Sequence, residues 1–88
     1  MVNKEIKIIN KHGLHARPAA LLVKVAGKFK SDIFLIKDGY EVNGKSIMGV
    51  MTLAAEPGSV LEIRINGPDE EQALQALEEL INGRFYED

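Results

Sequence analysis

The segment from residue 11 to residue 20, KHGLHARPAA, contains both histidines of the chain together with an arginine and a proline. Apolar residues recur with helical spacing after it, so a helix is predicted from Ala16 onward, with His15 directly before it. No Ser, Thr, Asp or Asn stands at this helix start to cap the first backbone N–H groups. Uncapped N–H groups at the positive end of a helix form an anion site. The N–H groups of Ala16 and Arg17 therefore predict a site for phosphate.

Two side chains add chemistry to this predicted phosphate site. The guanidinium of Arg17 offers a fork of donors that fits phosphate oxygens. The helix N-terminus disfavours a protonated imidazole at His15 and favours a phosphoryl group attached in its place. A neutral imidazole is a nucleophile, so the segment predicts that His15 accepts a phosphoryl group. Gly13 would let the chain turn tightly into the site. A surface histidine that only precedes a helix is the alternative interpretation.

His12, three residues before His15, raises the question of a metal site. No third Cys, His or carboxylate is close in the sequence, so we expect neither a metal nor another cofactor. No carboxylate flanks His15 to position a water molecule for hydrolysis. This favours a group that is held and handed on, and hence a carrier protein rather than an enzyme.

A second informative segment is NGKSIMGVM at residues 43–51. Ser46 stands where a short helix is expected to begin, and capping that helix could be its whole role. It could also be a regulatory phosphorylation site, because a phosphate there would meet the positive end of the helix. A short helix cannot bury all of Ile47, Met48 and Met51, so these side chains predict an exposed docking patch for partner proteins. A core that wraps further around the helices is the alternative.

The remaining sequence predicts the elements that must position these two segments. Apolar alternation predicts four strands, at 2–9, 32–37, 40–43 and 60–66. Helical apolar spacing predicts three helices, at 16–29, 46–54 and 68–82. Asp38-Gly39 predicts a hairpin turn, Pro68 suits the first helical position, and Gly83 suits a helix end. The tail RFYED is expected to fray.

The order β-α-β-β-α-β-α predicts an α+β fold, with helices on one face of an antiparallel sheet. In the first strand, Lys4, Ile6 and Ile8 are expected on one face. The predicted core residues of the first helix are Ala19, Leu22, Val23, Ala26 and Phe29, with Leu21 and Val25 outside this stripe. Those of the last strand and last helix are Leu61, Ile63, Ile65, Ala73, Leu74, Leu77, Leu80 and Ile81.

Length and composition limit the class of protein. The 88 residues fit a single domain over residues 1–88, and the absence of cysteine favours a reducing cytoplasm. The N-terminus resembles a strand, so neither a signal peptide nor membrane insertion is expected. A net charge of −2 argues against nucleic acid as the main partner.

Charge is unevenly distributed along the chain. Residues 1–50 contain nine Lys/Arg and four Asp/Glu, a balance of +5, whereas residues 51–88 contain two and nine, a balance of −7. A basic half around His15 favours an anionic ligand or an acidic partner. A chance distribution of surface charge is the alternative.

The segments GLHARPAA at 13–20 and NGKSIMGVM at 43–51, together with the element order, resemble the HPr family, the histidine-containing phosphocarriers of the bacterial phosphotransferase system. The resemblance covers nearly the whole chain and implies an open-faced β-sandwich with a four-stranded antiparallel sheet. It implies that His15 takes a phosphoryl group from enzyme I, which is charged by phosphoenolpyruvate. The group would be held on Nδ1, with Arg17 and the helix N-terminus around it, and passed to a histidine of an EIIA domain during sugar transport.

The same resemblance bears on regulation and docking. Ser46 matches the position that HPr kinase/phosphorylase modifies, which slows transfer to His15 and can create a co-regulator of transcription. Ile47 and Met48 match the docking patch, with Ala20 nearby. His12 departs from the family, which usually has a small polar residue there. A regulatory binding module, such as a nitrogen-branch or kinase-controlled paralogue, is the alternative function. We expect a monomer, since a carrier must present His15 to two partners.

Overall fold

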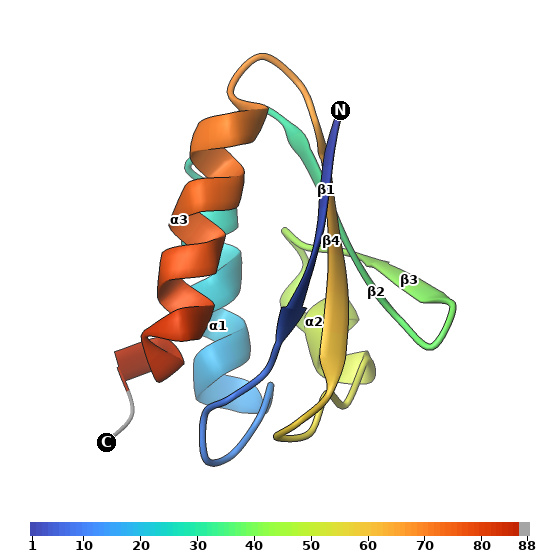
Figure 1. Cartoon of the computed structure of the whole chain (residues 1–88), viewed down its shortest axis with the longest axis vertical. Coiled ribbons are helices and arrows are strands. Elements are labelled where there is room, and N and C mark those ends of the chain that lie inside the picture. Colours follow the sequence, from blue (N-terminus) through green and yellow to red (C-terminus); the bar gives the residue numbers. More distant parts are fainter. Residues whose placement is uncertain (87–88) are drawn as a thin grey trace.

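The computed structural model describes residues 1–86. Within that range the elements follow the predicted order (Figure 1). They are β1 (Val2–Lys7), α1 (Ala16–Ala26), β2 (Asp32–Lys37), β3 (Tyr40–Asn43), α2 (Ile47–Thr52), β4 (Val60–Asn66) and α3 (Glu70–Asn82). A short helical turn, Arg84–Tyr86, follows α3. No helix of this range is long and apolar enough to cross a membrane.

The four strands form one antiparallel sheet in the order β1-β4-β2-β3. Ile63 of β4 lies opposite Lys4 of β1 on one side and opposite Leu35 of β2 on the other. The hairpin between β2 and β3 turns at Asp38 and Gly39, whose φ angles are 53° and 80°. Helices α1 and α3 lie side by side over one face of the sheet (Figure 1). The predicted α+β fold, an open-faced antiparallel sheet with helices on one face, is confirmed.

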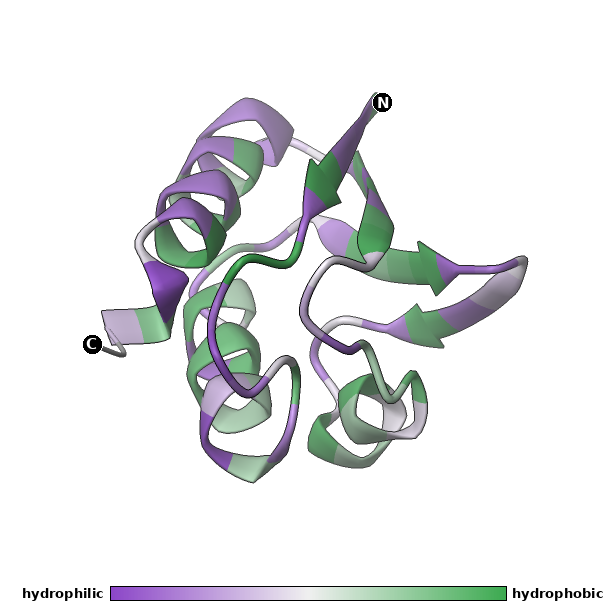
Figure 2. Ribbon diagram, turned by 60° about the horizontal axis from the view of Figure 1, so that its bottom comes forward, coloured by the Kyte–Doolittle hydropathy of each residue, from purple (hydrophilic) through white to green (hydrophobic). Residues whose placement is uncertain are grey.

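The hydrophobic core lies between the sheet and the helices, where most of the predicted core side chains are buried. Val23, Phe29 and Leu74 are partly buried and pack against this core. Leu21 and Val25 also pack against it, so the core wraps further around α1 than one helical stripe would cover. Figure 2 shows α3 as largely hydrophilic, whereas α2 is hydrophobic over most of its length. Helix α2 therefore has an apolar surface that the core does not use.

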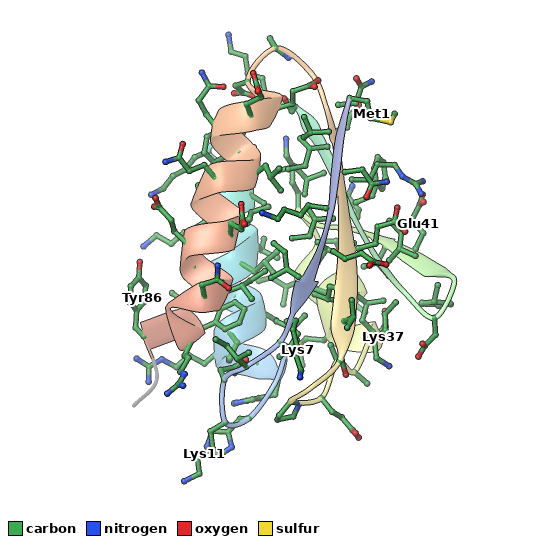
Figure 3. The ribbon with its side chains drawn as sticks, viewed as in Figure 1. Met1, Lys7, Lys11, Lys37, Glu41 and Tyr86 are labelled. Atoms are coloured by element: carbon green, nitrogen blue, oxygen red, sulfur yellow. The ribbon has the colours of Figure 1, made fainter. Side chains whose placement is uncertain are left out.

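The opposite face of the sheet carries a polar network beside the half-buried Phe34 and Ile36. Arg64 donates hydrogen bonds of 3.1 Å to Glu41 and to Glu62, and Asn3 donates one of 2.6 Å to Glu62. Glu41 lies on the side of the sheet away from α1 and α3 (Figure 3). Lys4 instead bonds to Glu78 of α3, which agrees with its predicted place on the same strand face as Ile6. The alternation of the strands therefore separates a helix-covered face from an open one.

Several predicted element ends are wrong: β1 ends at Lys7 rather than residue 9, and α2 covers Ile47–Thr52 rather than 46–54. Helix α1 ends at Ala26 rather than residue 29, with Gly27 as its C-cap. Helix α3 begins at Glu70, so Pro68 is not its first residue. The Glu70 carboxylate accepts a 3.1 Å bond from the N–H of Gly67, which holds the Gly67–Asp69 turn outside the helix. The predicted end at Gly83 is confirmed, since Gly83 is the C-cap of α3.

Asp69, the residue before α3, fastens this turn to the segment after α1. Its carboxylate accepts hydrogen bonds from the hydroxyl of Ser31 at 2.5 Å, the N–H of Lys30 at 2.9 Å and the N–H of Ser31 at 3.0 Å. These bonds favour the ionised carboxylate, that from the Ser31 side chain most of all. They lower the pKa of Asp69 from 3.8 to about 2.

The prediction of a frayed tail is wrong for Arg84–Tyr86. Phe85 is fully buried in the core, at 0% exposure, while Tyr86 points outward (Figure 3). The φ angles of these three residues are all positive, at 58°, 53° and 61°. Such left-handed backbone is unfavourable for non-glycine residues, and burial of the aromatic ring offsets that cost. The last two residues of the RFYED tail, 87 and 88, lie outside the described range.

Candidate functional site

The loop that carries His12 and His15 is fastened to the segment before β4. The N–H of Leu14 donates a 2.8 Å bond to the carbonyl oxygen of Ala55, and the side-chain amide of the buried Asn10 donates one of 2.9 Å to the carbonyl of Gly13. Gly13 has a φ of +67°, and a Cβ added there would lie 2.3 Å from the Ala55 oxygen. The predicted tight turn at Gly13 is confirmed, and close backbone contact adds a second reason for glycine.

His15 is the N-cap residue of α1. It has an extended backbone (φ −89°, ψ −164°), and its carbonyl accepts a 2.9 Å bond from the N–H of Ala19. Within residues 1–86, the imidazole makes no capping bond to the helix start, as predicted from the sequence. The N–H groups of Ala16 and Arg17 belong to the first turn, which has no intrahelical acceptors to offer them. The first turn of α1 also contains no acidic residue, so its positive end is not neutralised from within.

The side chains of this helix start divide into a buried and an exposed set. Pro18 and Ala19 are buried against the core, whereas His15, Arg17 and Ala20 are exposed. The buried pair fixes the orientation of the first turn. The exposed imidazole and guanidinium can therefore meet a ligand or a partner without any change in the core.

A hollow of about 230 Å³ opens beside His15. It is lined by His12, Leu14, His15, Ala54, Ala55, Glu56 and Pro57. The two imidazole rings lie with their centroids 5.3 Å apart and their planes at 87°, so the edge of one ring faces the plane of the other. Glu56 also lines this hollow. The sequence gives no signal for this, because Glu56 lies forty-one positions after His15 and reaches it only through the pairing of Leu14 with Ala55.

Ser46 is the N-cap of α2, as predicted. Its hydroxyl oxygen accepts a 3.1 Å bond from the N–H of Gly49. The neighbouring Lys45 reaches across to the end of the segment after α1, where its ammonium donates a 2.7 Å bond to the carbonyl of Phe29. The loop before α2 is therefore fixed at both Ser46 and Lys45.

An apolar surface follows Ser46 on α2. Ile47, Met48 and Met51 are 46%, 79% and 43% exposed. Helix α2 lies against α1 (Figure 2). Helix α1 carries the exposed Ala20. We call Ala20, Ile47, Met48 and Met51 the apolar patch. Exposed methionines at such density are typical of surfaces that adapt to partner proteins.

Two other kinds of site, a larger hollow and a metal site, have less support. A larger hollow of about 480 Å³ lies between α1 and α3 and is lined by Val25, Lys28, Phe29, Ala76, Glu79, Leu80 and Tyr86. It contains neither imidazole, so we place the functional site at the smaller hollow. In the described residues, no three His, Cys, Asp or Glu side chains gather as metal ligands would.

Comparison with known proteins identifies the family. The family model described as PTS HPr component phosphorylation site matches residues 2–83. The chain belongs to the HPr family. It is 51% identical over 88 residues to phosphocarrier protein HPr of Treponema pallidum, covering 100% of both chains. It is 53% identical over 88 residues to the HPr of Xylella fastidiosa strain Temecula1, covering 100% of this chain and 99% of that protein.

A solved HPr structure shows the same fold. The crystal structure of HPr-C-His from Thermoanaerobacter tengcongensis superimposes with a TM-score of 0.97 at 50% identity, covering 100% of this chain and 99% of that one. The family resemblance predicted from the sequence is confirmed. HPr proteins are the phosphocarriers of the phosphotransferase system, so the chain has a phosphocarrier function in that system.

Proposed function

We propose that His15 accepts a phosphoryl group from phosphorylated enzyme I and passes it to a histidine of an EIIA domain. The observation that carries this proposal is the exposed imidazole at the uncapped start of α1, on a backbone held by Gly13 and Ala55. The Nδ1 lone pair attacks phosphorus, and the new phosphorus–nitrogen bond forms as the bond to enzyme I breaks. The same exchange with EIIA returns His15 to its starting state, so the protein is a carrier without turnover of its own.

Arg17 and the first N–H groups of α1 are proposed to hold the phosphoryl oxygens. Backbone N–H groups at a helix start point outward along the axis, and the helix dipole there favours negative charge. Ala16 and Arg17 supply these groups, and the exposed guanidinium of Arg17 can add a two-pronged contact. Both interactions favour the phosphorylated state of His15 over the unphosphorylated state.

The apolar patch is proposed as the docking surface for enzyme I and EIIA. Its residues come from α1 and α2, two helices in contact, so a partner seated on them would approach the start of α1. The basic half of the chain around this site favours acidic partners. A monomeric single domain suffices for this role, because one copy presents His15 to each partner in turn.

Transfer of labelled phosphate tests the proposal. Phosphoenolpyruvate, enzyme I and the protein are mixed, and the label on the wild type is compared with that on His15→Ala. His15 is exposed, so the variant should fold normally, which circular dichroism checks. We expect labelled wild type and no label on the variant. Equal labelling of a folded His15→Ala protein would show that another residue is the acceptor.

The environment of Ser46 favours a second function, as a kinase-controlled regulatory binding module. Its hydroxyl caps α2 directly beside Ile47 and Met48. A phosphate there would add up to about two negative charges within the apolar patch. HPr kinase/phosphorylase would supply the group from ATP, and a transcription regulator is the partner that could read it.

Substitution of Ser46 tests this regulatory function. We expect Ser46→Asp to weaken binding to enzyme I several-fold, because a charge lies in the docking surface. Ser46→Asn is the matched control, since Asn caps a helix about as well as Asp without the charge. Titration calorimetry measures both affinities. Equal affinities for the two variants would contradict control of docking by charge at Ser46.

A further inference from the structure

His12 shares the hollow with His15 but has no place in the phosphoryl transfer described above. Its exposed ring lies 5.3 Å from that of His15, edge to face. Both imidazoles line one hollow together with Glu56. A phosphoryl group attached to His15 would therefore be next to the His12 ring in this hollow.

A phosphoryl group in this hollow needs positive charge around it. The group would bring about two negative charges to a hollow that Glu56 also lines. Arg17 is the one permanently charged cation of the first turn of α1. Imidazole is the side chain that changes charge near neutral pH, and once protonated both of its nitrogens are donors. His12 can therefore supply a second cation when it carries a proton.

We propose that His12 is a positioning residue for the phosphocarrier reaction. In its protonated form it donates a hydrogen bond to the phosphoryl group as that group moves onto His15. No proton leaves His12 and no covalent bond to it forms. The bonds that form and break in the transfer step are therefore those given above. The inference rests on the proposed function, since it requires His15 as the acceptor.

The proposal makes transfer depend on pH through His12. The titratable groups that share its hollow are His15, at the start of α1, and Glu56, from the segment before β4. Lys11 precedes it and points away from the body of the molecule at the end of the loop (Figure 3). Titration of enzyme I cancels when two variants are compared at each pH.

The test is the single-turnover rate of transfer from phosphorylated enzyme I, measured from pH 6 to pH 8.5. The wild type is compared with His12→Ala, with His12→Asn, which keeps an N–H donor without charge, and with Lys11→Ala, which removes a neighbouring cation. We expect the wild type to exceed His12→Ala roughly fivefold at pH 6, about the effect of one hydrogen bond. The ratio should fall as the pH rises to 8.5, where imidazole is neutral and keeps a single N–H donor.

The controls separate charge from structure. We expect the ratio of wild type to Lys11→Ala to stay constant with pH, and the ratio of His12→Asn to His12→Ala to stay constant as well. A wild-type rate equal to that of His12→Ala at every pH would overturn the role of His12. So would a His12→Ala rate that is lower by the same factor at every pH. Both results would leave His15 as the acceptor. Absence of transfer to the wild type would overturn both proposals together.

Discussion

Gly13 holds the loop of the two histidines against Ala55, and replacing it by alanine should both destabilise the protein and displace His15. A residue with a side chain at a φ of +67° pays about 1 kcal/mol in backbone strain. The added Cβ would lie 2.3 Å from the Ala55 oxygen, so the backbone must separate and the Leu14–Ala55 hydrogen bond is lost. That bond contributes about 1 kcal/mol, and relieving the overlap costs about 1 kcal/mol or more. We expect a total loss of about 3 kcal/mol.

Gly39 provides a matched control for this substitution. Its φ is +80°, but a Cβ there would meet nothing within 4 Å in the described part of the chain. Gly39→Ala should therefore cost only the backbone strain of about 1 kcal/mol. Urea denaturation should separate the variants, and thermal melting should give a Tm lower by about 12–24 °C for Gly13→Ala and about 4–8 °C for Gly39→Ala. Equal losses of stability would refute the argument that contact with Ala55 requires glycine at position 13.

Three further predictions follow from other contacts. Phe85→Ala should lower the free energy of unfolding by about 3–5 kcal/mol in urea denaturation, because its ring is fully buried. Tyr86→Ala, at an exposed residue, should change it by about 0.5 kcal/mol or less, and equal effects would contradict the packing of the tail. The pKa of Asp69 is depressed to about 2, so its contribution to stability is complete above pH 3.8 and is lost as the pH falls through about 2. Acid titration followed by circular dichroism should show the stability gap between wild type and Asp69→Asn closing over this interval, and a constant gap would refute it. Arg17→Ala should slow single-turnover phosphoryl transfer about tenfold, with Arg17→Lys intermediate, and an unchanged rate would remove the guanidinium from the mechanism.

Local patterns in the sequence predicted most of the fold. Strand alternation and helical spacing identified the elements, because each element buries one face that its own residues define. The Asp38-Gly39 turn and the Ser46 cap were predictable for the same reason, since their chemistry acts within four residues. The alternation of β4 and the apolar stripe of α3 likewise indicated which side chains form the core.

Two of the misses concern contacts between segments far apart in the chain. Pro68 looked like a first helical residue, but Asp69 bonds to Lys30 and Ser31, and the helix starts after it. Phe85 looked like part of a loose tail because its partners in the core come from other elements. Pattern reasoning within a short window cannot detect such partners.

The candidate site was likewise predictable only where its residues are close together in the sequence. The helix start with His15 and Arg17 was predictable, because uncapped N–H groups, an imidazole and a guanidinium follow one another in ten residues. Glu56 was not, since it reaches the hollow only through the Leu14–Ala55 hydrogen bond. The geometry of the His12–His15 ring pair, which carries the further inference, also required the folded loop.

Phosphorus NMR of the purified protein after incubation with phosphoenolpyruvate and enzyme I tests the central claim most directly. We expect a phosphohistidine signal that is stable in base and lost in acid, and that is absent from His15→Ala. A wild-type protein with no such signal, which gains an acid-stable phosphoserine signal once ATP and HPr kinase/phosphorylase are added, would contradict the claim that His15 carries the phosphoryl group.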